Sequence, residues 1–179
     1  MRRMERLSKD AILQALERLA QLLQPEGSPF ELLVFGGAAL VLLYDAREST
    51  KDVDALAVRP PGTRAVFEAA RTVAQEMGLP DDWMNDAAKG YLRGIAPGEL
   101  ILQSKTLVVR AAAPQQLLAM KLSAWRDDVD INDARLLLSK LAGAKKDVWA
   151  LVAPFLVPDR ELKAQYAFSD LWEAERGSH

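Results

Sequence analysis

The sequence predicts an α/β (α+β) fold in which a small mixed β-sheet is followed by a helical C-terminal half. Strand-like segments alternate with helical patterns as far as Arg110, whereas apolar residues after Pro114 recur only at helical spacing. We therefore expect a core at residues 1–113 and a helical region at residues 114–176 that packs on it. The last two helices either belong to that region alone or also cover the sheet.

The first helix is predicted after Ser8, a helix-capping residue, by apolar residues at steps of four, three and four: Ile12, Leu16, Leu19 and Leu23. The proline- and glycine-containing segment 25–29 ends it. The core then continues with a strand at 31–35, a short helix at 38–44, a strand at 53–58, a helix at 64–77, a short helix within 80–89, and hairpin strands at 99–103 and 106–110. The C-terminal half has helical patterns at 115–125, 130–141, 145–153 and 159–175.

The most informative motif is Phe35-Gly36-Gly37, where the first strand runs into a glycine pair and a short helix. Glycine has no Cβ, so the backbone can approach a ligand closely there. The helix that follows would point unpaired N–H groups and its positive end toward phosphate. The alternative interpretation is a tight turn without a ligand, because glycine pairs are common in such turns.

A pair of acidic residues, Asp52 and Asp54, follows on the next strand. In an extended segment their spacing places both carboxylates on one face, where they can share a hard divalent cation that also binds phosphate oxygens. A solvated strand edge is the alternative, but Val53 and the apolar run 55–58 indicate a buried strand. Two carboxylates at the mouth of a buried strand repel each other unless a cation lies between them. We therefore predict that both aspartates are metal ligands.

These motifs resemble those of the DNA polymerase β-like nucleotidyltransferase superfamily, in which Gly-Gly or Gly-Ser, a helix and Asp-x-Asp follow one another. The chain looks most similar to small bacterial AbiEii-toxin-like and nucleotidyltransferase-like proteins, whose Arg-x-Thr-x-Asp-Val/Ile-Asp motif is approximated by Arg47, Thr50, Asp52, Val53 and Asp54. This chain has one extra residue between the arginine and the threonine. Segments 83–90 and 118–133 also look similar, so the resemblance covers roughly residues 30–140.

The resemblance implies a nucleotide-binding set in which the arginine and threonine orient the aspartates or contact phosphate: Gly36, Gly37, Arg47, Thr50 and Lys121. Lys121 would face the triphosphate as a compact charge, with Asp130 or Asp133 as its acidic companion. The alternative for Lys121 is a lysine that only snorkels from the helical core. A capped, solvated helix and a site role are equally open for three further residues: Asn85, Asp86 and Lys89.

Active members of the superfamily usually add a third carboxylate from a later strand, the expected base for the incoming hydroxyl. The corresponding strand at 106–110 has no acidic residue, and Arg110 stands near the expected position of the acid. Glu99 or Asp133 could take its place. The predicted catalytic set is therefore Asp52, Asp54, Lys121 and Asp133.

By the same resemblance, the expected function is metal-dependent transfer of NMP from a nucleoside triphosphate to a hydroxyl of an RNA such as tRNA, of a protein or of a small molecule. The expected cofactor is Mg²⁺ or Mn²⁺ on Asp52 and Asp54. The chain could belong to a toxin–antitoxin or phage-defence pair with a cognate partner. The alternative function is a catalytically weak module of the same fold that acts by binding a partner protein.

The amino-acid composition leaves oxygen atoms as the expected ligands of any bound metal ion. The chain has no cysteine, and its single histidine is His179, within an ending at 177–179 that resembles the start of an expression tag. Thiolate sites and disulfides are thereby excluded, and we expect no native role for imidazole. The net charge of −2 gives no sign of a nucleic-acid-binding field. No apolar run reaches the ~18 residues of a membrane span, so we expect a cytoplasmic protein without membrane contact.

Overall fold

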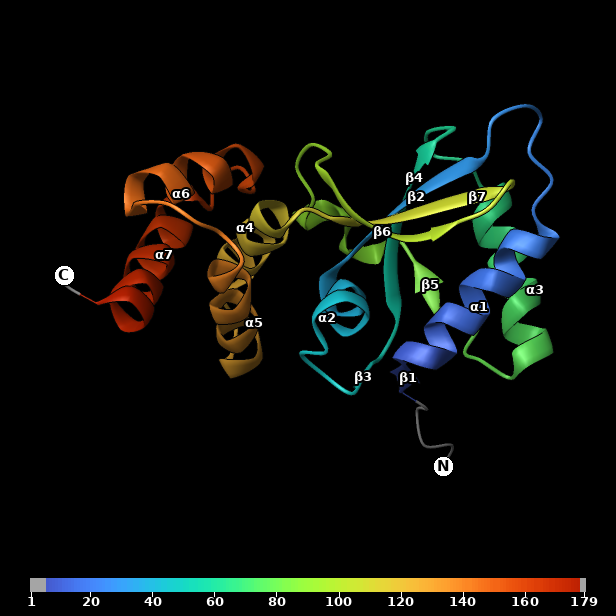
Figure 1. Ribbon diagram of the computed structural model, residues 1–179, viewed down its shortest axis with the longest axis horizontal. Helices are drawn as coiled ribbons and strands as arrows, with labels where there is room; N and C mark the ends of the chain where they lie inside the picture. The colour runs from blue at the N-terminus through green and yellow to red at the C-terminus, as the bar shows by residue number, and fades with distance from the viewer. Residues whose placement is uncertain (1–5, 178–179) are drawn as a thin grey trace. The chain divides into compact units, whose positions relative to one another are not determined.

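The computed structural model describes residues 6–177, so the predictions for His179 and for the end of the expected tag lie outside the described residues. The chain forms two compact units (Figure 1). The first contains the chain up to Lys89 together with Pro97–Ala112, and the second contains Gly90–Ala96 together with the chain from Ala113 onward. The predicted domain limits, and the packing of the helical region on the core, stay predictions.

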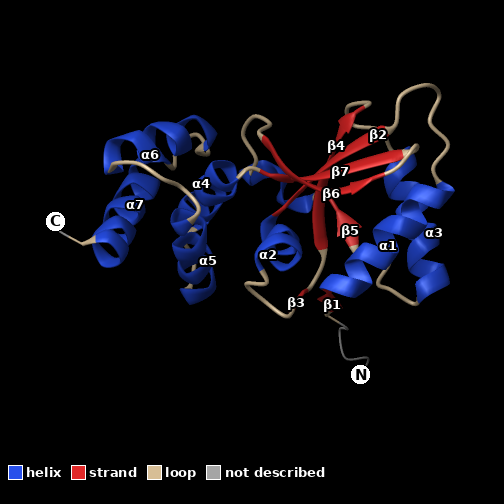
Figure 2. Ribbon diagram, viewed as in Figure 1, coloured by secondary structure: helices blue, strands red, loops and turns tan. Residues whose placement is uncertain are grey.

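The first unit is built on a five-stranded mixed sheet with the strand order β5-β4-β2-β7-β6 (Figure 2). Its strands are β2 (Phe30–Phe35), β4 (Val53–Arg59), β5 (Met84–Asn85), β6 (Pro97–Gln103) and β7 (Leu107–Ala112). The central strand β2 runs antiparallel to β4 and parallel to β7, while β5 is parallel to β4 and β6 is antiparallel to β7. The prediction of a small mixed sheet that ends in a hairpin is therefore confirmed.

The alternation of side chains gives this sheet two different faces. On one face Val53 and Ala55 are fully buried, as core residues of the unit. On the other face, which we call the open face, the β4 side chains Asp54, Leu56 and Val58 are only partly buried. The open face is thus open at β4, whereas Leu33 and Phe35 of β2, which lie on the same face, are buried.

Three helices complete the first unit: α1 (Lys9–Leu22), α2 (Gly36–Tyr44) and α3 (Ala65–Met77). The first begins as predicted, because the Ser8 hydroxyl accepts a hydrogen bond from the Ala11 N–H at 3.2 Å. The apolar residues that predicted this helix are all buried. Helices α1 and α3 pack side by side, and Arg18 Nε and Nη2 donate to the Glu76 carboxylate at 2.6 and 3.0 Å.

The helix predicted within residues 80–89 is wrong in part, because the structure has the short strand β5 there. The cause is tertiary. Trp83 is fully buried, and its indole N–H donates to the Ala70 carbonyl at 2.8 Å. The Trp83 carbonyl in turn accepts from the Val53 N–H at 2.7 Å, which holds this segment against the edge of β4.

The 3₁₀ helix η1 (Ala87–Tyr91) overlaps the end of the helix predicted within residues 80–89, whereas two short strands were not predicted from the sequence: β1 (Leu7–Ser8) and β3 (Ser49–Thr50). The strands β1 and β3 pair antiparallel with each other in a separate two-stranded sheet. Elements of two residues are too short to show a hydrophobic period, so only their pairing reveals them.

The second unit consists of helices, as predicted: α4 (Pro114–Ala124), α5 (Asp128–Ser139), α6 (Lys145–Val152), the 3₁₀ helix η2 (Ala153–Phe155) and α7 (Glu161–Arg176). Helix α4 is central, because α5, α6 and α7 all pack against it and nearly all of its side chains are buried. It has only 11 residues. In the described part of the chain, no helix is both long and apolar enough to cross a lipid bilayer.

The segment Gly90–Ala96 joins this helical unit through Gln116, a fully buried residue of α4. The Gln116 amide nitrogen donates to the carbonyls of Arg93 and Gly94 at 3.0 and 2.9 Å, and its amide oxygen accepts from the Ala96 N–H at 2.9 Å. One side chain therefore satisfies three backbone groups of a segment that has no regular structure of its own over most of its length.

Candidate functional site

The site is organised by the contact between Gly36 and Asp54. Strand β2 ends at Phe35, which is paired with Asp54 in the antiparallel register, so α2 begins beside this carboxylate. Gly36 has a φ of 64°, and a Cβ at this position would lie 2.7 Å from Asp54 Oδ2. Glycine is thus required twice, by the left-handed backbone and by the closeness of the carboxylate.

The second glycine meets two other predicted residues. A Cβ on Gly37 would lie 2.9 Å from Thr50 Oγ1 and 3.2 Å from Arg47 Nη1. Thr50 is itself buried, and its hydroxyl donates to the Asp52 carbonyl at 3.2 Å. The structure therefore brings together the glycine pair, the arginine, the threonine and both aspartates, and the extra residue between the arginine and the threonine does not separate them.

The N-terminus of α2 opens onto this group of residues. The sequence placed the start of the helix at residue 38, but both glycines are its first residues. The N-cap residue Phe35 makes no side-chain cap hydrogen bond, and the N-terminus of this nine-residue helix presents N–H groups without partners inside the helix and a partial positive charge. This end is suited to bind an anion.

Asn85 is the residue that fixes Asp52. It lies on β5 as the register partner of Asp54, and its amide nitrogen donates to Asp52 Oδ2 at 3.1 Å and to the Asp82 carbonyl at 3.2 Å. Its amide oxygen accepts from the Ala87 N–H at 2.8 Å. The amide group is therefore held at both ends, and it holds one oxygen of Asp52 in turn.

The sequence left Asn85, Asp86 and Lys89 open between a solvated helix and a site role, and the structure separates them. Asp86 and Lys89 form an exposed ion pair at 2.8 Å, whereas Asn85 contacts an aspartate of the site. The sequence contains one signal that could have indicated the position of Asn85: the apolar pair Trp83-Met84 immediately before it is consistent with a short buried strand as well as with a helix.

No third carboxylate joins Asp52 and Asp54 in a metal-binding group, as judged over residues 6–177. Glu99, one of the two expected substitutes, lies in β6, where its charge acts on Tyr44 of α2. Burial and, secondarily, the charge of Glu99 raise the pKa of the Tyr44 hydroxyl. The residue on which the charge of Glu99 acts is therefore Tyr44, not Asp52 or Asp54.

The other predicted residues form a cluster inside the helical unit. Lys121 Nζ lies 3.0 Å from Asp130 Oδ1 and 2.7 Å from Asp133 Oδ2, so it pairs with both candidate acids. Arg126 was not foreseen, although its i,i+4 spacing to Asp130 is a recognised ion-pair signal. Its Nε donates to Asp130 Oδ2 at 3.0 Å, and its backbone N–H donates to the same oxygen at 3.0 Å.

The cationic groups of Lys121 and Arg126 control the protonation of Asp130, whose side chain is 1% exposed. Burial alone would raise its pKa, but hydrogen bonds from Arg126 and Lys121 outweigh burial and lower the pKa from 3.8 to about 2. The cluster is thus a charged, mutually compensated network at physiological pH. The catalytic and nucleotide-binding roles of Lys121 and Asp133 stay predictions.

Comparison with known protein families decides the class of the protein. The sequence matches the model of the family DUF6036, described as a nucleotidyltransferase of unknown function, over residues 11–141. The chain belongs to this nucleotidyltransferase family. The match includes the glycine pair, both aspartates of the Asp-x-Asp motif and the lysine cluster of the helical unit. Searches of curated proteins and of solved structures gave no match.

Membership confirms that the chain is a nucleotidyltransferase, as the strand–glycine–helix–aspartate motif predicted. The finer likeness to AbiEii-type toxins stays a prediction, as do the metal and the acceptor.

We predict that Gly36→Ala destabilises the nucleotidyltransferase more than Gly62→Ala does. Both glycines have a φ of 64°, but a Cβ on Gly62 would meet no atom within 4 Å. The Gly62 variant therefore measures backbone strain alone, about 1 kcal/mol. Gly36→Ala should cost roughly 1 kcal/mol more, because its methyl group overlaps Asp54. Chemical denaturation measures both, and equal free energies of unfolding would contradict the close packing of Gly36 on Asp54.

A second prediction concerns the pH dependence of stability. Because folding lowers the pKa of Asp130, its ionised form stabilises the fold above pH 3.8, and this stabilisation is lost as the pH falls toward 2. The stability difference between wild type and Asp130→Asn should therefore shrink by about 2 kcal/mol between pH 5 and pH 2. Denaturation curves at each pH test this. Asp128→Asn, at an exposed position of the same helix, is the control and should show no such change.

Proposed function

We propose that this nucleotidyltransferase binds a nucleoside triphosphate at Gly36 and Gly37 and transfers NMP to a hydroxyl group of an acceptor. The observation that carries the proposal is the contact of the glycine pair with Asp54, Thr50 and Arg47, all within about 3 Å of the Cβ positions that the glycines leave open. An anion-binding helix end and a pair of acids thus meet at one point, which is the arrangement that metal-assisted transfer from a triphosphate requires.

The residues present fit a hard divalent cation. Asp52 and Asp54 offer carboxylate oxygens, and Asn85 engages only Oδ2 of Asp52. Mg²⁺ commonly binds through one or two carboxylates and completes its coordination with water and substrate phosphates. We propose that Asp52 and Asp54 hold Mg²⁺ or Mn²⁺ together with the triphosphate. The cation would neutralise phosphate charge and act as a Lewis acid.

The protein groups have separate tasks in the proposed reaction. The α2 N–H groups, Arg47 and Thr50 hold phosphate oxygens and align the triphosphate. The acceptor oxygen forms a bond to the α-phosphorus, the bond from that phosphorus to the bridging oxygen breaks, and pyrophosphate leaves. The hydroxyl proton passes to a carboxylate, for which we retain Asp133, and Lys121 is retained as a phosphate ligand by resemblance to the superfamily.

A second candidate is a module that binds nucleotide but acts through a partner protein, as in a toxin–antitoxin or phage-defence pair. The observation in its favour is that Lys121 and Asp133 already pair with each other at 2.7 Å inside the helical unit. If this pair persists with nucleotide bound, Asp133 does not serve as the base, and transfer would be slow.

The proposal predicts that α-labelled nucleoside triphosphate with Mg²⁺ labels an acceptor from RNA, protein or small-molecule pools. Asp52→Asn and Asp54→Asn should lower the rate by roughly 10²-fold or more, because each removes a charge that holds the cation and the transition state. The exposed Asp81→Asn is the control and should keep wild-type activity.

Nucleotide binding without transfer to any pool would favour the partner-binding candidate. Wild-type protein that binds no triphosphate in the presence of Mg²⁺, as measured by calorimetry, would contradict both candidates.

Asn85→Ala should raise the Mg²⁺ concentration needed for half-maximal activity by about tenfold or more, the effect typical of a residue that orients a metal ligand. The rate at saturating Mg²⁺ should fall much less, because Asp52 and Asp54 remain. Metal titrations of the initial rate separate the two quantities. Asn132→Ala, which removes an exposed amide from α5, should leave the titration unchanged. An equal loss of rate at every Mg²⁺ concentration would exclude an orienting role for Asn85.

A further inference from the structure

The two site residues Arg47 and Thr50 lie in a segment with little regular structure of its own. The segment runs from Asp45, which caps the C-terminus of α2, to the end of the two-residue strand β3. A two-stranded sheet is marginally stable by itself even when its strands are longer than this. The position of Arg47 and Thr50 beside the glycine pair therefore depends on what holds the segment in place.

The strand β1 pairs with β3 and so holds this segment from a distant part of the sequence. Leu7 is the register partner of Thr50, and Ser8 is the register partner of Ser49 (Figure 1). Arg6, immediately before β1, adds a contact, because its Nη2 donates to the Ser49 carbonyl at 3.5 Å. The site residue Thr50 is thus tied directly to Leu7.

Leu7 anchors β1 in the core of the first unit. Its side chain is 2% exposed, so a displacement of β1 would bring a large apolar side chain into water. The next residue, Ser8, caps α1 through its hydroxyl, so β1 also continues directly into a helix whose apolar face is buried. The strand is therefore held by the core on one side and by α1 on the other.

An ion pair makes a second link between the same two parts of the chain. Lys9 Nζ lies 3.1 Å from Asp45 Oδ1, at the start of the segment that carries Arg47. The two side chains are 42% and 79% exposed. An exposed pair of this kind contributes little to stability. The buried Leu7, rather than Lys9, is thus the principal anchor.

Thr50 passes the position of β3 on to the nucleotide site. Its side chain is 5% exposed, and its hydroxyl donates to the Asp52 carbonyl at 3.2 Å. Its Oγ1 also lies 2.9 Å from the Cβ position that Gly37 leaves open. A shift of β3 would therefore move Thr50 away from the glycine pair and release the backbone that presents Asp52.

We propose that Leu7 is a positioning residue for the nucleotide site. By holding β1 against β3, it keeps Thr50 and Arg47 beside the glycine pair and thereby sets the affinity for the Mg²⁺-bound triphosphate. Leu7 acts through Thr50 and takes no part in the bond changes of the reaction. This inference rests on the proposed function, to which it adds a residue of a strand that lies far from the motif in sequence.

Calorimetry with the full-length protein measures this role. ATP, GTP, CTP and UTP are each titrated into wild type with Mg²⁺, and the nucleotide that binds most tightly is then titrated into the variants. Leu7→Ala should raise its Kd by about tenfold or more, as expected for a residue that orients a binding group.

The measurements are made at a temperature at which denaturation curves show each variant to be folded. If about nine-tenths or more of a variant is folded, unfolding changes its apparent Kd by only about 10%. A tenfold rise therefore reports a displaced site and not a loss of folded protein.

Leu23→Ala is the matched control. Leu23 is also a buried leucine, 4% exposed, and it follows the last residue of α1. A helix of 14 residues separates it from β1 by about 21 Å. Leu23→Ala should lose stability as Leu7→Ala does, but it should keep the wild-type Kd. Equal Kd values for the two variants would overturn the proposal.

Two milder variants show whether the buried volume of Leu7 is what matters. Leu7→Met preserves that volume and should recover most of the affinity that Leu7→Ala loses. Leu7→Val replaces Leu7→Ala if the alanine variant does not fold, and it should raise the Kd by a smaller factor. A wild-type Kd in Leu7→Val would then overturn the proposal.

Amide hydrogen exchange tests the same link without nucleotide. In Leu7→Ala, exchange within residues 45–50 should be faster than in wild type, whereas Leu23→Ala should leave it unchanged, because only the first variant releases β3. Unchanged exchange in Leu7→Ala would overturn the inference whether or not nucleotide binds. Wild type that binds none of the four triphosphates with Mg²⁺ would instead count against the proposed function.

Discussion

The absence of a side chain at Gly36 is the constraint on which the site depends. The end of β2, the start of α2 and the carboxylate of Asp54 converge at this position, and a Cβ would lie 2.7 Å from Asp54 Oδ2. Any larger residue would force the helix or the strand to move. The closeness of the helix N-terminus to the acidic pair follows from this packing, and with it the possibility of binding a phosphate and a cation at one point.

Asp130 and Asp52 lie in different surroundings, and these determine whether the charge of each carboxylate is compensated by the protein. Asp130 is buried and hydrogen-bonded by two cationic side chains, so its charge is compensated within the helical unit and contributes to stability. Asp52 is held by Asn85, a neutral amide that orients one oxygen without cancelling the charge. The first arrangement is that of a structural ion pair, and the second is compatible with the metal-ligand role that we propose for Asp52.

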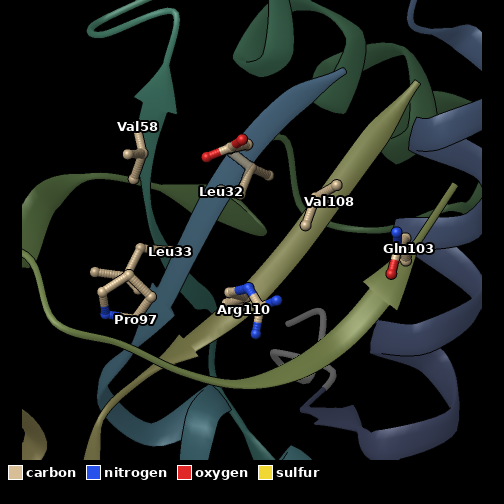
Figure 3. Close-up of a pocket in the computed structure, with 8 residues that line it drawn as sticks. Leu32, Leu33, Val58, Pro97, Gln103, Val108 and Arg110 are labelled. Atoms are coloured by element: carbon tan, nitrogen blue, oxygen red, sulfur yellow. The ribbon is translucent and has the colours of Figure 1, made fainter. Parts of the chain in front are cut away.

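The sheet has one face on which the β4 side chains Asp54, Leu56 and Val58 are only partly buried. A groove on this face is lined by apolar side chains together with Glu31, Gln103 and Arg110 (Figure 3). Membership in the family identifies the chain as a nucleotidyltransferase, but a shared fold does not by itself identify the acceptor.

The sequence by itself determined the features that depend on residues close together in the chain. These are the first strand, the glycine pair, the following helix and the spacing of Asp52 and Asp54. Backbone preference and side-chain period act over a few neighbouring residues, so a sequence pattern is sufficient to predict them. It did not determine the strand β5, because this segment was predicted to be helical. In the structure Trp83 is buried and the residues that follow it pair with β4. The hydrogen bond from Asn85 to Asp52 was equally hidden, since it joins residues 33 positions apart. Only the tertiary structure decided these features, because strand pairing and the low pKa of Asp130 depend on groups that folding brings together.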